Sequence, residues 1–238
     1  MLTQTLPFFG INLSGWMLKR MLKGCFNFKP PKVRYSCTWD VKTVLKFLCT
    51  LYPLEDLSLK CLTFKLIALI ALTTAARAQS LSALDLKYMS YDRRQCIIVF
   101  HIQKLLKTSR PGVSLPAIVL KRYEKPELCV VKTLLSYINR TKDVRKTSSL
   151  FISFVTYDEV TTSTLARWLK SVLELSGINS SIFKAHSFRG AAASAAFLSG
   201  CKMKDILLTA NWSNAETFYK FYHKKFVKDK DFAYAVLQ

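Results

Sequence analysis

The first part of the chain alternates apolar and polar residues at helical spacing. Residues 11–23 predict one short helix that Gly24 breaks. Residues 27–35 contain a Pro-Pro pair that cannot continue a helix, so a linker is expected there. Residues 38–52 predict the next helix, because apolar side chains recur at the spacing of one helical face: Trp39, Val41, Val44, Leu45, Leu48 and Leu51.

The most apolar stretch follows. The run LIALIALTTAA at residues 66–76 predicts a buried helix, which Asp56 or Ser58 could cap and which would extend to about Arg77. The run is shorter than the roughly 20 apolar residues that cross a bilayer, so a core helix is expected. A further short helix is expected near residues 80–84.

The pattern changes to that of strands in the middle of the chain. CIIVFHI (residues 96–102) is β-branched and apolar, KTSRPG (107–112) is typical of a turn, and VSLPAIVL (113–120) predicts a returning strand. The pair predicts a β-hairpin or a three-stranded sheet. Residues 149–154 are interpreted as one more short strand.

Helical patterns return after Pro126, over residues 127–139, 161–176, 189–199, 202–209 and 214–227. The expected fold class is therefore mainly α with a small antiparallel β-sheet (α+β), which is inserted after the first third of the chain.

The net charge narrows the class of partner. The 238 residues hold 36 Lys and Arg against 15 Asp and Glu, a formal net charge of +21, and 50% of them are hydrophobic. A domain this basic usually meets a polyanion, nucleic acid first and an anionic membrane second. Because the cations are spread along the whole chain, a disordered basic arm does not explain the charge.

The cysteines and the N-terminus favour an intracellular protein. The 7 cysteines form no CxxC pair, so a zinc site is not expected, and free thiols in a reducing compartment are the default. No basic segment precedes the few apolar residues at the N-terminus, so a secretory signal is not expected. We expect a protein of the nucleus, with no metal and no membrane partner.

One stretch concentrates positive charge in front of a segment that is apolar enough to bury. KAHSFRG at residues 184–190 brings Lys184, His186 and Arg189 together, ahead of the small-residue run AAASAAFLSG. Arginine binds phosphate bidentately, and a helix N-terminus adds N–H donors and a positive dipole. We therefore expect the start of this helix to hold a phosphate.

The other candidate residues occur in a fixed order around this stretch. They are Arg77 in AARAQSL, Lys107 in a hairpin turn, His186 and Arg189 at the start of a helix, Trp212 in NWSNAETF, and Tyr222 in FYHK. This order resembles that of the tyrosine recombinases (phage integrase-like), over most of residues 38–227. The amino-acid sequence of residues 59–81 is most similar to that of recombinases of eukaryotic mobile elements of the DIRS, Ngaro and Crypton type.

The resemblance implies a domain layout and an activity. Residues 1–35 would be a remnant of the family's N-terminal DNA-binding domain with its linker, and residues 36–238 the catalytic domain. Tyr222 would attack a DNA phosphodiester and form a 3′-phosphotyrosyl bond, with no metal and no nucleotide cofactor. Such an enzyme recombines and integrates double-stranded DNA as a homo-oligomer, usually a tetramer.

The resemblance also assigns a role to each remaining residue. Arg77 and Arg189 would bind the non-bridging phosphate oxygens, and Lys107 would protonate the leaving 5′-oxygen as general acid. His186 would hydrogen-bond the phosphate or accept the tyrosine proton, and Trp212 would donate its indole N–H to the same oxygens.

Departures from the family pattern leave alternatives open. Ser80 replaces an acidic residue that the family often has, and the longer interval from Trp212 to Tyr222 makes Tyr219 a rival nucleophile. Taken alone, Arg77 could be a helix-ending cation and Tyr222 part of a core stripe. The competing functions are a catalytically inactive DNA-binding remnant or domesticated derivative and, more distantly, an interaction module for RNA or acidic proteins.

Overall fold

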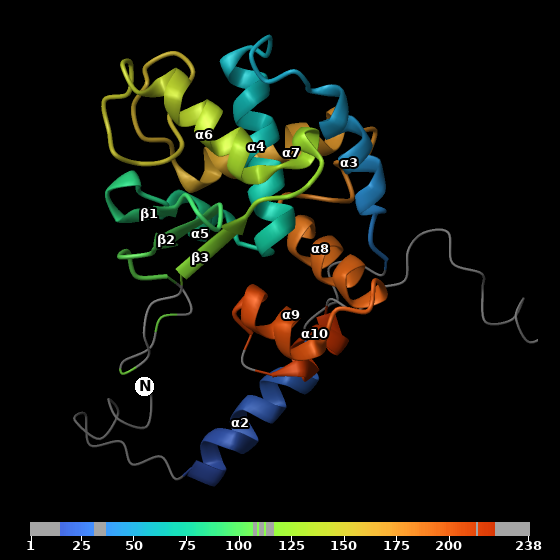
Figure 1. Ribbon diagram of the computed structural model, residues 1–238. Coiled ribbons are helices and arrows are strands. Elements are labelled where there is room, and N and C mark those ends of the chain that lie inside the picture. The colour runs from blue at the N-terminus through green and yellow to red at the C-terminus, as the bar shows by residue number, and fades with distance from the viewer. Residues whose placement is uncertain are drawn as a thin grey trace, which may run out of the picture. The chain divides into compact units, whose positions relative to one another are not determined.

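The computed structural model describes residues 15–30, 37–106, 109, 112, 117–212 and 214–221 (Figure 1). The chain divides into two compact units, Met1–Arg34 and Tyr35–Gln238. In the first unit the described residues form α2 (Gly15–Phe28), none of whose residues is buried. The helix runs through Gly24, so the predicted break there is wrong. One glycine inside a helix costs only about 1 kcal/mol relative to alanine, which the rest of the helix can offset.

The second unit consists of helices around a small sheet. Its helices are α3 (Val41–Thr50), α4 (Leu59–Thr74), α5 (Ala78–Ser82), α6 (Val130–Thr141), α7 (Thr162–Leu175), α8 (Ser187–Leu198), α9 (Met203–Ala210) and α10 (Ala215–Phe221), with 3₁₀ turns η2 (Leu86–Tyr88) and η3 (Pro126–Leu128). Strands β1 (Met89–Asp92), β2 (Ile97–His101) and β3 (Ala117–Lys121) form an antiparallel sheet in the order β1-β2-β3. The predicted fold class, mainly α with a small antiparallel sheet, is confirmed.

Helix α4 is the centre of the core. It packs against α6, α7, α8 and β3 (Figure 1). It is buried along almost its whole length, because most of its residues are apolar. Of the two predicted caps, Ser58 is the one used, since its hydroxyl accepts a hydrogen bond from the Cys61 amide at 3.2 Å. The helix ends at Thr74, where Ala75 adopts the left-handed conformation (φ 49°, ψ 28°). None of the described helices is long and apolar enough to cross a membrane.

The sheet packs one face onto the helices. Its buried side chains come from two cross-strand pairs, Ile98 with Leu120 and Phe100 with Ile118. Of the two predicted alternatives, the three-stranded sheet is present. Its first strand, β1, was not predicted, because the segment MSYD is short and carries no run of apolar residues.

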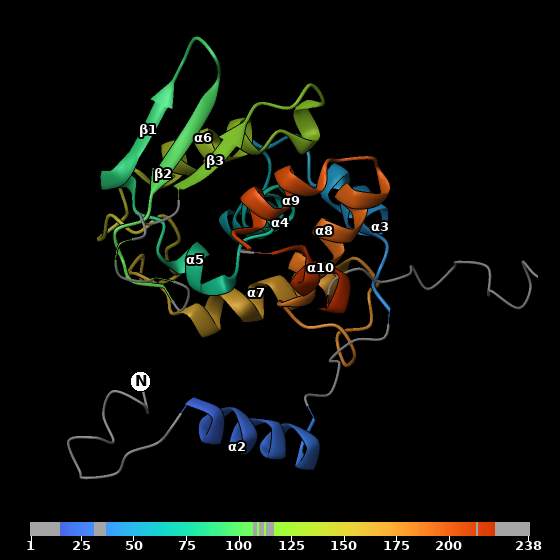
Figure 2. The same ribbon diagram turned by 90° about the horizontal axis from the view of Figure 1, so that it is seen from below.

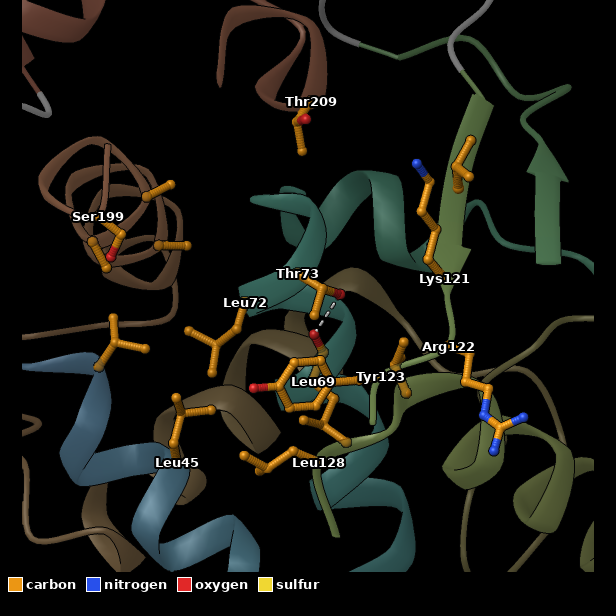
Figure 3. Close-up of a pocket in the computed structure, with 16 residues that line it drawn as sticks. Leu45, Leu69, Leu72, Thr73, Lys121, Arg122, Tyr123, Leu128, Ser199 and Thr209 are labelled. Carbon is orange, nitrogen blue, oxygen red and sulfur yellow. Dashed lines mark hydrogen bonds between the residues drawn. The ribbon is translucent and has the colours of Figure 1, made fainter. Parts of the chain in front are cut away.

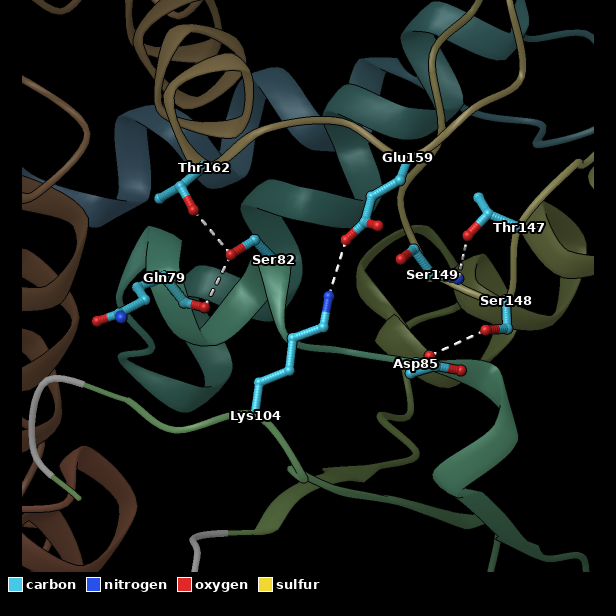
Figure 4. Close-up of polar contacts among 9 residues, drawn as sticks. All are labelled: Gln79, Ser82, Asp85, Lys104, Thr147, Ser148, Ser149, Glu159 and Thr162. Carbon is cyan, nitrogen blue, oxygen red and sulfur yellow. Dashed lines mark hydrogen bonds and ion pairs between the residues drawn. The ribbon is translucent and has the colours of Figure 1, made fainter. Parts of the chain in front are cut away.

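Residues 149–154 do not form a strand. They make only isolated bridges, from Asp85 to Ser149 and from Ile152 to Glu159. Figure 4 shows how side chains hold this region: the Ser148 hydroxyl donates to Asp85 at 2.9 Å, and Lys104 forms a 2.8 Å ion pair with Glu159. The hydrogen bond from Lys104 lowers the pKa of the Glu159 carboxyl.

A second, smaller hydrophobic cluster lies apart from the main core. Its buried members come mainly from α8, α9 and the segment up to α10: Ala75, Ala193, Ile206, Ala210, Trp212 and Phe218. Figure 2 shows α8, α9 and α10 next to one another on one side of α4. This cluster contains one residue of the predicted site, Trp212.

Candidate functional site

Arg77 lies at the junction between α4 and α5. Ala75 ends α4, and the extended backbone of Arg77 (φ −81°, ψ 154°) then leads into α5 as its N-cap residue. The prediction that Arg77 ends the apolar helix is therefore wrong, because the left-handed turn at Ala75 ends that helix earlier. The Arg77 side chain makes no cap hydrogen bond and is half-buried.

The short helix that follows Arg77 is fixed to the body of the unit. Leu81 is fully buried, and α5 packs against α7. The Ser82 hydroxyl lies 2.8 Å from that of Thr162, at the start of α7 (Figure 4). The main core therefore determines where the backbone of Arg77 lies.

Arg189 lies in the first turn of α8 and is almost completely buried, with 3% of its surface exposed. Its Nη1 donates to the carbonyl of Ala75 at 2.6 Å, and its Nη2 donates to the carbonyl of Ala210. These carbonyls lie at the C-terminal ends of α4 and α9, where backbone acceptors have no partner within the helix. One guanidinium thus connects three helices.

Two backbone carbonyls and an aromatic ring lie against the buried charge of Arg189. The two carbonyls lie at helix C-termini, which carry the negative end of the helix dipole. The guanidinium carbon also lies 4.5 Å from the centre of the Trp212 ring, a cation–π contact. Trp212 is itself buried and packs against Phe218. The guanidinium is therefore held in a fixed orientation.

One pocket contains both predicted arginines. It has a volume of about 250 Å³, and its lining comes from the α4–α5 junction, the neighbourhood of β2 and β3, α8 and α9: Thr74, Ala76, Arg77, Ser80, Ile102, Ala117, Ile118, Arg189, Leu208, Thr209, Ala210 and Asn211. Among the described residues of this lining, the charged side chains are those of Arg77 and Arg189, and none is acidic. Hydroxyl and amide side chains supply further donors. The pocket is therefore suited to an anion.

The other predicted site residues lie elsewhere or outside the described residues. His186 is half-buried at the N-cap position of α8 and does not line the arginine pocket. Trp212 does not line it either, but contacts Arg189. Tyr219 on α10 is 51% exposed, and its ring meets those of Phe197 and Phe218. Lys107 and Tyr222 lie outside the described residues.

A larger pocket of about 770 Å³ lies between α3, α4, β3, α8 and α9 (Figure 3). Its lining is mostly apolar, with Leu45, Leu69 and Leu72 along the helices, while Lys121 and Arg122 come from the end of β3. None of the predicted site residues that the structure describes lines it. Its size alone does not make it the site, because it lacks both arginines that the residue order singles out.

Sequence reasoning missed the polar members Thr74 and Thr209 of the pocket, and one more that carried a signal, Asn211. It follows α9 in the left-handed conformation (φ 50°, ψ 56°). A signal existed, because asparagine after a helix tolerates this conformation better than other non-glycine residues.

No cluster of three or more His, Cys, Asp or Glu side chains in the described part of the chain could hold a metal ion.

Comparison of the chain with known protein families identifies one that matches. The phage integrase family model matches residues 40–228. No curated protein sequence matches the chain.

Three solved structures resemble it. The first is a XerH site-specific recombinase bound to palindromic difH substrate in a post-cleavage complex, with 15% identity and a TM-score of 0.58 over 78% of this chain and 48% of that chain. The second is a XerA recombinase, with 18% identity and a TM-score of 0.58 over 93% of this chain and 70% of that chain. The third is a lambda integrase dimer bound to a COC' core site, with 12% identity and a TM-score of 0.51 over 90% of this chain and 73% of that chain.

The chain spans about half the length of the XerH chain, 48% of it. At these identities the solved structures show the fold of the second unit, whereas the family model covers most of the chain. Fold, residue order and family model agree, and the chain belongs to the phage integrase family, that of the tyrosine recombinases.

Proposed function

We propose that this chain contains the catalytic domain of a site-specific DNA recombinase, in which two arginines hold one DNA phosphodiester for attack by a tyrosine. The observation that carries the proposal is the pocket that Arg77 and Arg189 share, because two cations from separate segments line it and none of its described lining residues is acidic. Family membership supports the same reading.

The two arginines contribute in different ways. Arg189 is held by two backbone carbonyls and the Trp212 ring, so its charge needs no reorganisation when a phosphate gains negative charge. Arg77 takes part in neither of the two ion pairs found among the described residues, Lys104–Glu159 and Lys170–Glu174. It is half-buried at the edge of the same pocket, where an anion from outside can serve as its partner.

The proposed reaction is a transfer of the phosphoryl group to tyrosine. The Tyr222 hydroxyl attacks the phosphorus, the bond to the 5′-oxygen breaks, and a 3′-phosphotyrosyl bond forms. Lys107 gives a proton to the leaving 5′-oxygen, and His186 accepts the tyrosine proton. A 5′-hydroxyl from another strand then reverses the step. The roles of Lys107, His186 and Tyr222 rest on the family resemblance.

The partner we propose is double-stranded DNA. The net charge of +21 supports a polyanionic partner, and the XerH and lambda integrase structures contain their DNA sites. On the family resemblance we propose a homo-oligomer on DNA, a tetramer in the complete reaction. The biological setting we propose is a eukaryotic mobile element of the DIRS, Ngaro or Crypton type, acting in the nucleus.

A covalent-adduct assay tests the proposal. The substrate is a pool of short DNA duplexes with randomised centres and a nick. After cleavage the short 5′-hydroxyl fragment diffuses away from the duplex, and the protein stays attached to the DNA. Wild type should give a detergent-resistant DNA–protein band. Tyr222→Phe should abolish the band while leaving DNA affinity nearly intact, and the matched variant Tyr219→Phe should keep it.

The outcomes separate the alternatives. A band that survives Tyr222→Phe and disappears with Tyr219→Phe would reassign the nucleophile. If wild type binds duplex DNA but forms no adduct with any member of the pool, the catalytic proposal is wrong and the chain is a DNA-binding remnant.

A further inference from the structure

Trp39 makes a buried contact with the helix that carries Arg189. The Trp39 indole N–H donates a hydrogen bond to the Ser187 hydroxyl at 2.8 Å, across 148 positions of the sequence. Both side chains are buried, with 2% and 4% of their surfaces exposed. The Trp39 ring also meets the Phe188 ring edge-on, with centroids 5.1 Å apart. Two consecutive residues at the start of α8 are therefore held by one tryptophan.

The geometry of an α-helix places this contact opposite the arginine pocket. Successive residues are separated by about 100° around a helix, so Ser187 and Arg189 point about 200° apart. Ser187 meets Trp39, whereas the Arg189 guanidinium reaches the carbonyls of Ala75 and Ala210. The first turn of α8 is thus held from two sides, and a rotation that relaxes one contact displaces the other.

The start of α8 lacks the usual side-chain cap. His186 occupies the N-cap position with helical backbone angles and makes no side-chain cap hydrogen bond. The chain enters the helix through turn-like backbone bonds, from the Ser187 amide to the Lys184 carbonyl at 2.7 Å and from the Phe188 amide to the Ala185 carbonyl at 3.3 Å. A serine hydroxyl often caps a helix at this end, but the Ser187 hydroxyl instead accepts the hydrogen bond from the Trp39 indole N–H.

We propose that Trp39 is a positioning residue for the arginine pocket. Its hydrogen bond to Ser187 sets the rotation of the first turn of α8 and thereby the place of the Arg189 guanidinium. Trp39 does not line the pocket itself. The consequence for catalysis rests on the proposed recombinase function, while the effect on the guanidinium is a separate, measurable property of the folded chain.

The test compares four variants of the full chain. Ser187→Ala removes the acceptor, Ser187→Thr keeps a hydroxyl, and Trp39→Phe removes the N–H while keeping an aromatic ring. Tyr137→Phe is the matched control, because it deletes another buried hydrogen bond, from the Ile152 amide to the Tyr137 hydroxyl at 3.2 Å, away from the pocket lining.

Three quantities are measured on each variant. The first is the set of NMR signals of the Arg189 guanidinium N–H groups, which the variant Arg189→Lys serves to assign. The second is the single-turnover rate of adduct formation on the randomised nicked duplexes, and the third is the thermal midpoint of unfolding. The NMR signals do not depend on catalysis, so they remain informative if the chain forms no adduct.

Ser187→Ala and Trp39→Phe should each shift or broaden the guanidinium signals and slow adduct formation about 10- to 100-fold, with little change in DNA affinity. Combining the two should add little, because either change breaks the same contact. Ser187→Thr should restore both the signals and the rate.

Tyr137→Phe should lower the thermal midpoint without moving the Arg189 signals. Unchanged signals in Ser187→Ala, or changes equal to those of Tyr137→Phe, would overturn the proposal. If wild type forms no adduct, the proposed function fails, and the guanidinium signals alone decide the positioning role.

Discussion

Replacement of Lys65 by methionine should remove a pH-dependent part of the stability of the fold. Lys65 is fully buried in α4, and its ammonium donates to the carbonyls of Leu48 at 3.0 Å and Leu51 at 2.5 Å, at the end of α3. Burial lowers the pKa of Lys65 from 10.5 to about 8, although the charges of Cys49 and Glu127 act in the opposite direction.

The direction of the effect follows from proton binding. The unfolded chain keeps the Lys65 proton up to about pH 10.5, whereas the folded chain releases it above about pH 8. Between these values the unfolded chain binds more protons, so the free energy of unfolding rises with pH. One unit of pKa difference corresponds to about 1.4 kcal/mol. The lowering from 10.5 to about 8 therefore corresponds to a rise of order 3 kcal/mol across this window.

Urea unfolding at a series of pH values measures this term. The difference in unfolding free energy between wild type and Lys65→Met should be constant below pH 8 and should then rise in favour of wild type up to about pH 10.5. Lys60→Met is the matched control, since it removes an exposed lysine from the same helix and the same unit of net charge. A wild-type advantage over Lys65→Met that stays flat or falls through this window would refute the reasoning.

Three further predictions concern the site, its DNA partner and the loop that Arg145 supports. Arg77→Met should slow adduct formation by about 10² to 10³ and leave the thermal midpoint near that of wild type; an unchanged rate would place the phosphate elsewhere. The affinity for a labelled DNA duplex, followed by fluorescence anisotropy, should fall steeply with added salt, and a flat response would contradict DNA as the partner. Arg145→Met should lower the free energy of unfolding in urea by about 2 to 3 kcal/mol, because Arg145 donates to the Ser149 carbonyl at 2.8 Å and to the Thr141 hydroxyl at 2.6 Å. If this free energy falls by less than it does for a substitution at an exposed position, Arg145 does not support the loop.

Local signals predicted most of the fold. The apolar run of α4 and the cap at Ser58 are both properties of neighbouring residues, and the structure has both. Most failures occurred where tertiary contacts decide. Strand β1 forms because its backbone pairs with β2, although its own residues carry no strand pattern. Helix α2 is the local exception: none of its residues is buried, and it continues through Gly24 because one glycine costs little. Residues 149–154 are held mainly by loop contacts.

For the candidate site, the sequence indicated residue types but not their geometry. The residue order singled out Arg77 and Arg189, which share one pocket. The reversal at Ala75 that places Arg77 beyond α4 carries no sequence signal, because alanine seldom adopts the left-handed conformation. The bond between Trp39 and Ser187 joins distant positions, so no periodic pattern could reveal it.

The two hydrophobic clusters give the molecule two levels of cooperativity. The smaller cluster buries few side chains, so α9 and α10 should open locally at a lower free energy than the whole domain needs to unfold. Such an opening breaks the bond from Arg189 to Ala210 and removes Trp212 from the guanidinium, while Arg77 stays with the main core. The arginine pocket therefore exists only in the closed form of this subdomain. Hydrogen exchange of the α9 amides measures the fraction of molecules in which the pocket is assembled.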